Sequence, residues 1–401
     1  MESPNATRLA AGDVLEVLIE KVAHGGHFIA RHGGAVIFVR HAIPGERARI
    51  TITSTSASFN RGDVIEVLEA SPDRVIAPCS FAHRNGCGGC DFQHISLDHQ
   101  RGLKADVITE QFSRIASMDV VVQVEEVAEP LHWRTRLIAA TNREGKLGFF
   151  ASRSHNVIAV DDCLIAVKSM NIHELAARRW KSDVRVEVSA SSNKERTIAL
   201  SPKNGEEKAR LTEGNQIVHE EVKGKTLEVS QNSFWQSHVN APTVLTDVVI
   251  DFAQLVEGDH VLDLYGGVGL FTSSMVERVG SSGSIDLLEG SKSATADAKR
   301  NFTNNTNVKI HLGDVAKLLP RVSHADVIVL DPPREGAGKI VIAEMSRLRP
   351  RAIVYVSCDP ASLARDSAYL EAHGYSLSTI RAFDLFPMTH HVECVALYRP
   401  F

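Results

Sequence analysis

Alternating apolar and polar residues dominate the first 70 positions of the chain. Segments such as LEVLIEKV, HFIARH and AVIFVR alternate with a period of two, and glycine-containing turns separate them. This period is typical of β-strands that bury one face, and closely spaced turns between such strands are typical of a small barrel. The pattern predicts an OB-like β-barrel over residues 1–72, ending in a Ser-Pro-Asp-Arg linker at 71–74.

The pattern becomes mixed over residues 73–235. Residues 75–100 are rich in glycine and cysteine, and residues 98–117 have the spacing of a helix. Segments such as VVVQVEEV and VRVEVS then return to the period of strands. We therefore expect a central β-rich domain with a mostly antiparallel sheet, and a helix at 98–117 that packs on the domain that follows.

Helical patterns alternate with short apolar runs over residues 236–401. The clearest runs are HVLDLYG, GSIDLLEG, ADVIVLDPP and AIVYVSCDP. Strands that alternate with helices predict a mostly parallel sheet covered by helices on both faces. The fold class that follows is α/β, with a Rossmann-like third domain behind the barrel and the central domain.

Length and composition limit the function classes. The chain has 401 residues, of which 43% are apolar and 23% charged, as in an average globular protein. Because no apolar run spans a bilayer, no signal pattern opens the chain and no coiled-coil pattern is present, we expect a cytoplasmic monomer without a membrane partner. The net charge of −5 does not indicate nucleic-acid binding, which must rest on local basic clusters.

Acidic residues follow successive predicted strands of the third domain. Asp263 precedes glycines at 266, 267 and 269 in DLYGGVG, Glu289 ends IDLLEG, and Asp314 ends HLGD. Ligands of open α/β sheets bind at the carboxyl ends of strands, where an acid suits the hydroxyls of a ribose and glycine admits a close backbone approach. Each acid alone is more typical of a cap or loop residue. Together they predict a nucleotide-like cofactor site of the S-adenosylmethionine type.

A single cysteine, Cys358, lies where the apolar run AIVYVS ends. Asp359 is a favourable N-cap and Pro360 a favourable first helical residue, while Gly374 suits the end of that helix. A buried structural cysteine is the commoner case, but a thiol just before a helix N-terminus has its pKa lowered and becomes reactive. The position therefore favours a nucleophile.

Two carboxylates are candidates to assist this cysteine. Glu393 lies on the last apolar run beside His390 and His391, and a carboxylate close to the thiol is a candidate general base, although a strand glutamate is more often solvated. Asp331 precedes two prolines in DPPREG, which fix an extended exit from the strand and hold the acid at the sheet edge.

In this order, DLYGGVG, DPPREG, YVSCDPASLARD and FPMTHHVE resemble the motifs of the RNA uracil-C5 methyltransferases, over nearly the whole chain. The resemblance implies that Cys358 adds to C6 of a uracil and that Glu393 removes the C5 proton, with the base taken out of its stack. It also implies cofactor contacts from Gln236, Tyr265, Glu289 and Asp331, with Asp331 also orienting the base.

The chain departs from the family motif at three positions. Asp359 replaces the usual asparagine, which preserves the helix cap but adds a charge that opposes thiolate formation. Leu270 stands where many members have a polar residue, and Gly266 replaces a common cysteine. Within the glycine turn, Gly267 and Gly269 remain the expected backbone contacts of the cofactor.

Three cysteines crowd into CSFAHRNGCGGC and a fourth lies in VDDCLIA. Their spacing, C-x7-C-x2-C for Cys79, Cys87 and Cys90 followed by distant Cys163, suits either tetrahedral zinc or an iron–sulfur cluster. The resemblance implies a [4Fe-4S] cluster on these four residues. We expect it to have a structural or RNA-orienting role, because the methylation contains no redox step.

The barrel resembles a TRAM domain, an RNA-binding module, most clearly at VIFVRHAIPGERARI. Its candidate phosphate contacts are arginines, and its candidate stacking residues are Phe28 and Phe38. The arginines are Arg31, Arg40, Arg47, Arg49 and Arg61. A second basic group lies on the central sheet and is the stronger candidate. It comprises Arg134, Arg136, Arg143, Lys146 and Arg153.

The sequence thus predicts an S-adenosylmethionine-dependent RNA (uracil-C5)-methyltransferase. The barrel and the cysteine group resemble the members that act on 23S rRNA, while some members with both features modify tRNA. A protein of another class, a catalytically silent Fe–S RNA-binding protein, is the main alternative, and Asp359 is its only support. An amino- or N-methyltransferase would not need Cys358.

Overall fold

Five strands of the N-terminal segment close into a barrel in the computed structural model, which describes residues 9–56, 58–203 and 209–401. The first eight residues of the predicted barrel segment lie outside this part. The strands, in the spatial order β1-β2-β3-β5-β4, are β1 Val14–Ala23, β2 His27–His32, β3 Ala35–Arg40, β4 Arg47–Thr55 and β5 Asn60–Glu69. Their period-two pattern buries one face of each strand, and Phe28, Ile37 and Ile50 lie inside the barrel.

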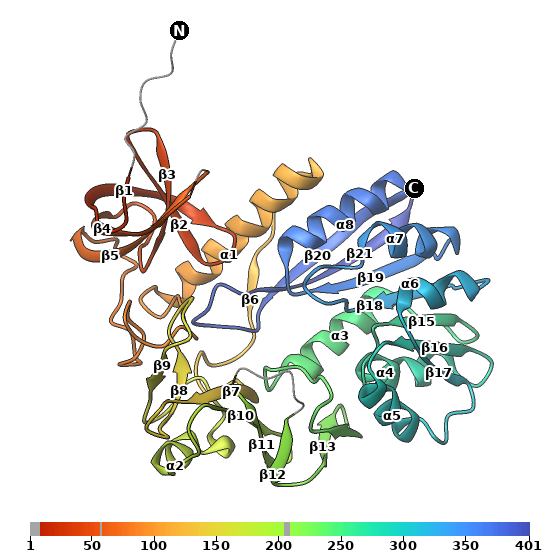
Figure 1. Cartoon of the computed structure of the whole chain (residues 1–401). Coiled ribbons are helices and arrows are strands. Elements are labelled where there is room, and N and C mark those ends of the chain that lie inside the picture. Colours follow the sequence, from red (N-terminus) through yellow and green to blue (C-terminus); the bar gives the residue numbers. More distant parts are fainter. Residues whose placement is uncertain (1–8, 57, 204–208) are drawn as a thin grey trace.

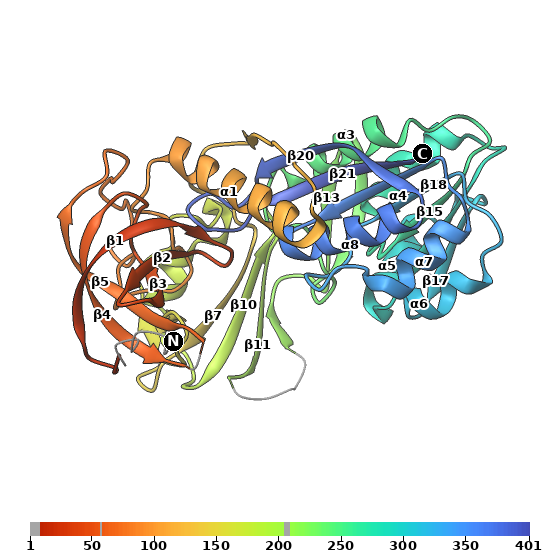
Figure 2. The same ribbon diagram turned by 90° about the horizontal axis from the view of Figure 1, so that it is seen from above.

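Helix α1, Leu97–Gln111, leads out of the cysteine-rich loop and continues as one π-helical turn over Phe112–Ala116. It lies between the barrel and the third domain (Figure 2). Its Ile108 and Phe112 are fully buried in the same apolar cluster as helix α8, Pro360–Ala372. The helix predicted at 98–117 therefore packs on the third domain.

The central sheet has six strands in the order β12-β11-β10-β7-β8-β9, and all its pairs are antiparallel. The strands are β7 Arg136–Thr141, β8 Leu147–Phe150, β9 Val157–Ala159, β10 Val184–Ala190, β11 Arg196–Pro202 and β12 Arg210–Glu213. The short helix α2, Ile172–Ala177, packs under the sheet. A separate hairpin follows, formed by β13 Ile217–Val222 and β14 Lys225–Ser230.

The third domain contains an eight-stranded sheet in the order β17-β16-β15-β18-β19-β21-β20-β6. Its strands are β15 His260–Leu264, β16 Ser284–Glu289, β17 Val308–Leu312, β18 Val327–Leu330, β19 Ala352–Ser357, β20 Tyr375–Asp384, β21 Glu393–Pro400 and β6 Val124–Glu126. The five strands β15 to β19 are parallel to one another, and β21 runs antiparallel to β19. Parallel strands buried on both faces explain the continuous apolar runs of the sequence.

Helices cover both faces of this sheet (Figure 1). On one face lie α3 Ala241–Ala253, α4 Leu270–Val279 and α5 Lys292–Asn301. On the other lie α6 Val315–Leu318, α7 Gly338–Arg347 and α8. No helix in the described part of the chain is long and apolar enough to cross a membrane.

Two segments lie elsewhere than the sequence pattern suggested. The strand expected in VVVQVEEV is only β6, and it joins the edge of the eight-stranded sheet by pairing with β20 instead of entering the central sheet. The β13–β14 hairpin buries Val218, Val222, Leu227 and Val229 in the same apolar cluster as helix α3. Long-range packing, which period-two alternation does not encode, decides both placements.

Candidate active site

Cys358 lies where strand β19 meets helix α8, as the sequence predicted. Asp359 caps the helix, its Oδ1 accepting a hydrogen bond from the Ser362 amide at 2.8 Å, and Pro360 is the first helical residue. Cys358 is partly exposed and lines a cavity of about 230 Å³. Arg334 and His391 line the same cavity. The thiol is therefore accessible from this cavity.

The predicted lowering of the Cys358 pKa is wrong for this structure. Burial, together with the nearby carboxylates of Glu393 and Asp331, raises the pKa of the thiol to about 12. Asp359 acts in the same direction, as its charge predicts, whereas Arg334 opposes the three carboxylates. Loss of hydration and three acidic neighbours thus favour the neutral thiol in the free protein.

The antiparallel pairing of β19 with β21 brings Glu393 to Cys358. Ser357 is paired with Cys394, so the next residues in register, Cys358 and Glu393, come opposite each other. Glu393 is 3% exposed, and burial together with the charge of Asp331 raises its pKa well above the usual range. A carboxylate with a raised pKa is a stronger base once it has lost its proton.

Asp331 follows β18, the neighbour of β19, and completes the group. Burial and the charge of Asp263 raise its pKa to about 7, although the Gln236 side chain lowers it by donating to Oδ2 at 3.1 Å. The pKa of Asp263 is raised mainly by burial and in smaller part by the charge of Glu289. One row of interacting carboxylates therefore runs from Glu289 through Asp263 and Asp331 to Glu393. The row joins the predicted cofactor residues to the predicted nucleophile.

Arg334 was not among the site residues predicted from the sequence. It belongs to DPPREG, lines the cavity of Cys358, and its charge favours the ionised forms of both Cys358 and Glu393. Arg334 could have been predicted from its place three residues after Asp331, because the rigid Pro-Pro segment between them directs the next side chains toward the same edge of the sheet.

The glycine turn after β15 has the features of a cofactor site. Asp263 is 1% exposed and its Oδ2 binds the backbone and hydroxyl of Thr272, while its Oδ1 has no hydrogen-bond partner among the described residues. Burial raises the pKa of this carboxyl to about 7. A buried acceptor without a partner, facing a glycine turn, fits a ligand that brings a donor.

The other predicted cofactor residues surround this turn. Glu289 holds it in place, because its Oε2 accepts from the Gly267 amide at 3.0 Å. Tyr265 has a left-handed backbone, and burial raises its pKa to about 12, with Asp314 as the next cause. Asp314 is exposed and caps α6. At Gly269 a side chain would collide with the Phe302 ring, so only glycine fits there.

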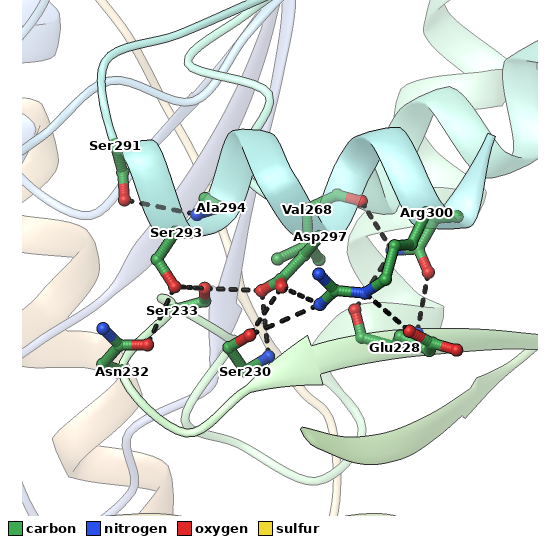
Figure 3. A network of polar contacts seen from close by, with 11 residues as sticks. Glu228, Ser230, Asn232, Ser233, Val268, Ser291, Ser293, Ala294, Asp297 and Arg300 are labelled. Atoms are coloured by element: carbon green, nitrogen blue, oxygen red, sulfur yellow. Dashed lines mark hydrogen bonds and ion pairs between the residues drawn. The ribbon is translucent and has the colours of Figure 1, made fainter. Parts of the chain in front are cut away.

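A polar network fixes the segment that carries Gln236 (Figure 3). The fully buried Asp297 of α5 accepts hydrogen bonds from the Ser230 amide at 2.9 Å, the Ser230 hydroxyl at 2.6 Å and the Ser233 hydroxyl at 2.5 Å. Arg300 pairs with the same carboxylate and with Glu228. The network ties hairpin β13–β14 to α5 and ends three residues before Gln236.

The four cysteines of the predicted metal group line one small cavity between the loop and the central domain. It contains Cys79, Cys87, Cys90 and Cys163, and all four are free thiols. Burial raises the pKa of Cys90 to about 12 and of Cys163 to about 11. Within the described residues, no group of three His, Cys, Asp or Glu side chains forms a ready metal site. Four sulfur donors around one cavity fit a cluster in kind and number.

Most arginines of the barrel are already paired with carboxylates. Arg31 pairs with Glu20, Arg40 with Asp63, Arg47 with Glu69, and Arg49 with Glu16 and Glu66. In the described part of the barrel, Arg61 has no such partner and lies over the ring of Phe59 at 4.9 Å. Phe28 is buried in the core with its ring centroid 5.8 Å from that of Phe92, so its predicted role in base stacking is wrong. Phe38 is partly exposed and contacts Phe59 edge-on.

The five basic residues of the central domain lie in three places. Arg134 and Arg136 line a groove of about 480 Å³ together with three of the cysteines, and Arg136 donates to the Ser233 carbonyl at 2.7 Å. Arg143 and Lys146 are exposed on the turn between β7 and β8. Arg153 lines a separate cavity with Arg40. They do not form the single patch that the sequence suggested.

Comparisons with known proteins agree with this architecture. The TRAM domain matches residues 8–65, the methyltransferase small domain matches residues 231–352, and the tRNA (Uracil-5-)-methyltransferase family matches residues 319–399. An RNA methyltransferase of Streptomyces avermitilis is 40% identical over 97% of this chain and 99% of its own length. One of Streptomyces coelicolor is 39% identical over 97% and 93%.

The crystal structure of Pyrococcus abyssi tRNA (uracil-54, C5)-methyltransferase with S-adenosyl-L-homocysteine has the same fold. It superposes with a TM-score of 0.73 over 96% of this chain and 99% of its own, at 22% identity. Fold and matches define an S-adenosylmethionine-dependent enzyme that modifies RNA. The chain belongs to the RNA (uracil-5-)-methyltransferase family, with an N-terminal TRAM domain, as its motifs predicted.

Proposed function

We propose that this enzyme methylates C5 of a specific uridine in RNA, with Cys358 as nucleophile and Glu393 as general base. The observation that carries the proposal is their placement: the pairing of Ser357 with Cys394 brings Cys358, the first residue after β19, to Glu393, the first residue of β21, beside Asp331. With this placement the thiol can attack C6 of a uracil while the carboxylate takes the proton from the neighbouring C5 of the same base.

Different residues of the chain act in the successive steps of this reaction. The Cys358 thiolate adds to C6 of the uracil, which places negative charge on O4 and makes C5 nucleophilic. Glu393 accepts the C5 proton after C5 has gained the methyl group, and the C6–S bond then breaks to release the thiolate. Arg334 favours the ionised forms of both groups, and Asp331 orients the base.

S-adenosylmethionine supplies the methyl group, and the residues around the glycine turn fit it. Asp263 offers an unpartnered buried acceptor, Glu289 lies at the end of the next strand where a ribose is bound, and Gly267 leaves open space above the backbone. Gln236, Tyr265, Gly269, Asp314 and Asp331 complete the proposed contacts.

We assign a [4Fe-4S] cluster to Cys79, Cys87, Cys90 and Cys163, on the basis of their donor set and their common cavity. Arg134 lies within electrostatic range of three of these thiols, so its cation balances negative charge on the cluster. The cluster would join the cysteine loop to the central domain and has no part in methyl transfer.

For the substrate we propose a uridine of 23S rRNA, bound by the TRAM barrel and the arginines of the central domain. The support is the combination of barrel and cysteine group, together with Arg134 and Arg153 lining cavities beside the cysteine loop. A tRNA uridine is the second candidate, because both the matching family description and the superposed structure name tRNA. We expect the enzyme to act as a cytoplasmic monomer.

The test is methyl transfer from labelled S-adenosylmethionine to unmodified 23S rRNA and tRNA transcripts in parallel. We expect 5-methyluridine in the rRNA, and loss of transfer to background in Cys358→Ala. Labelling of tRNA alone would replace the proposed substrate. Labelling of neither RNA by a protein that binds the cofactor would favour a silent RNA-binding protein, and unchanged transfer by Cys358→Ala would contradict the mechanism.

A further inference from the structure

The turn between strands β1 and β2 lies over the catalytic cysteine. The cavity of Cys358 is walled on one side by residues 22–26 of the barrel and on the other by Arg334, Asp359 and His391 of the third domain. Although the barrel is the N-terminal domain, it forms part of the same enclosure as the nucleophile.

One polar contact joins the two walls. His24 Nε2 of the turn lies 2.9 Å from Oδ2 of Asp359, and the other oxygen of that carboxylate caps helix α8. Both side chains are partly exposed, at 40% for His24 and 22% for Asp359. Each oxygen of Asp359 thus has its own partner, one on the helix and one on the barrel.

Asp359 needs a compensating charge because of its position. Asparagine would cap the helix equally well, but aspartate adds a negative charge directly after Cys358. That charge opposes ionisation of the thiol, which burial, Glu393 and Asp331 already disfavour. A cation within hydrogen-bond distance of Asp359 removes part of this opposition.

We propose that protonated His24 neutralises Asp359 and thereby acts as a positioning residue that keeps Cys358 able to form its thiolate. The inference rests on the proposed role of Cys358 as nucleophile. It makes the β1–β2 turn of the TRAM barrel a working part of the catalytic centre, in addition to any contact that the barrel makes with RNA.

The pair is intact in a defined pH window. The hydrogen bond to Asp359 raises the pKa of His24, and although burial raises the pKa of Asp359, the bond from His24 holds it below its usual range. Compensation is therefore present between the lowered pKa of Asp359 and the raised pKa of His24, and it is lost as the pH rises through the raised pKa of His24. Around this pair the cavity is lined by the following other titratable or charged groups: Cys358, Arg334, Lys104, His390 and His391.

Two of these groups are already paired with other residues. Lys104 binds Asp384, and His390 binds Asp91. Arg334 acts on Cys358 and Glu393. Burial and neighbouring cations lower the pKa of His391 to about 3, so it stays neutral. Within the described lining, His24 is thus the cation in contact with Asp359.

The test measures the reaction of Cys358 with N-ethylmaleimide at about pH 7, followed at the level of the Cys358 peptide by mass spectrometry. Four proteins form a cycle: the wild type, His24→Gln, Asp359→Asn and the double variant. His32→Gln, at the end of strand β2, is the matched barrel control. We expect His24→Gln to slow the reaction roughly threefold to tenfold in the wild-type background and to have no effect in the Asp359→Asn background.

A second variant separates charge from structure. His24→Lys keeps a cation at the turn and should restore the rate, and it should maintain that rate above the pH at which His24 loses its proton. An equal effect of His24→Gln in both backgrounds, an equal effect of His32→Gln, or no effect at all would overturn the inference. The assay uses neither RNA nor cofactor, so its result is independent of whether the proposed methyl transfer is found.

Discussion

At Cys358, two opposing influences act on one thiol. The helix that starts at Pro360 favours the thiolate, but burial and the acidic side chains of Glu393 and Asp331 raise the pKa to about 12. A nucleophile held mostly in its neutral form reacts only slowly with solutes that enter the cavity. The free enzyme is therefore poorly reactive, and substrate binding must change the balance.

The raised pKa values predict an alkaline rise in activity. Cys358 and Glu393 act in their deprotonated forms, and both have pKa values above the usual range. Single-turnover methyl transfer should therefore increase from about pH 6 to about pH 9. A rate that is constant or falls over this range, measured with RNA and cofactor saturating, would show that the neutral forms are competent.

Asp331→Asn should stabilise the free enzyme at alkaline pH while it weakens catalysis. The pKa of Asp331 is raised to about 7 in the folded protein and is ordinary in the unfolded chain, so the folded state binds the proton more tightly. The contribution of this carboxyl to the free energy of unfolding is therefore most favourable in acid and is lost as the pH rises to about 7. We expect a gain of about 1–3 kcal/mol at about pH 8 and little change at about pH 4, measured by urea unfolding. A loss of stability at both pH values would contradict the assignment.

At the scale of elements, strand pairing creates the site. The sequence indicated Cys358 and Glu393 separately, from a strand end and from an apolar run. It did not indicate that β21 runs antiparallel to β19, which is what brings the two residues opposite each other. The parallel strands were predictable because burial on both faces leaves a continuous apolar pattern, whereas strand direction leaves no local signal.

The β13–β14 hairpin holds Gln236 in place through Asp297. Asp297→Ala leaves the buried Ser230 amide and the Ser233 hydroxyl without their partner, so we expect a loss of about 2–4 kcal/mol in unfolding free energy and weaker cofactor binding. Glu228→Gln is the matched control, because it alters a 40% exposed partner of Arg300 in the same network. Calorimetric titration with S-adenosyl-L-homocysteine measures the binding. Equal effects of the two substitutions would contradict the role of the buried carboxylate.

At the scale of the whole molecule, the barrel and the α/β domain share one cavity. The sequence identified both domains because their hydrophobic periods differ. It did not show that the turn at His24 reaches Asp359, since these residues are 335 positions apart and neither pattern encodes docking. Most barrel arginines likewise proved to be paired with carboxylates, which composition does not reveal.

Gly26→Ala tests whether this docking matters. A Cβ on Gly26 would overlap the Asp91 carboxylate and lie 2.7 Å from His390 Nδ1, so either the barrel turn or the Asp91–His390 pair beside the active site must shift. Gly34→Ala is the matched control, because its φ of +82° imposes similar backbone strain with nothing within 4 Å. We expect methyl transfer to RNA to fall about tenfold to a hundredfold for Gly26→Ala relative to Gly34→Ala. Equal activities would show that the barrel turn is dispensable.

The central claim is that Cys358 forms a covalent bond with a uracil base. The most direct measurement uses RNA in which uridine is replaced by 5-fluorouridine, because fluorine at C5 cannot be removed as a proton by Glu393 and the adduct is trapped. We predict a stable protein–RNA complex that requires S-adenosylmethionine, maps to the peptide containing Cys358 and is absent in Cys358→Ala. A complex that persists in Cys358→Ala, or no complex with an RNA that the enzyme methylates, would contradict the account.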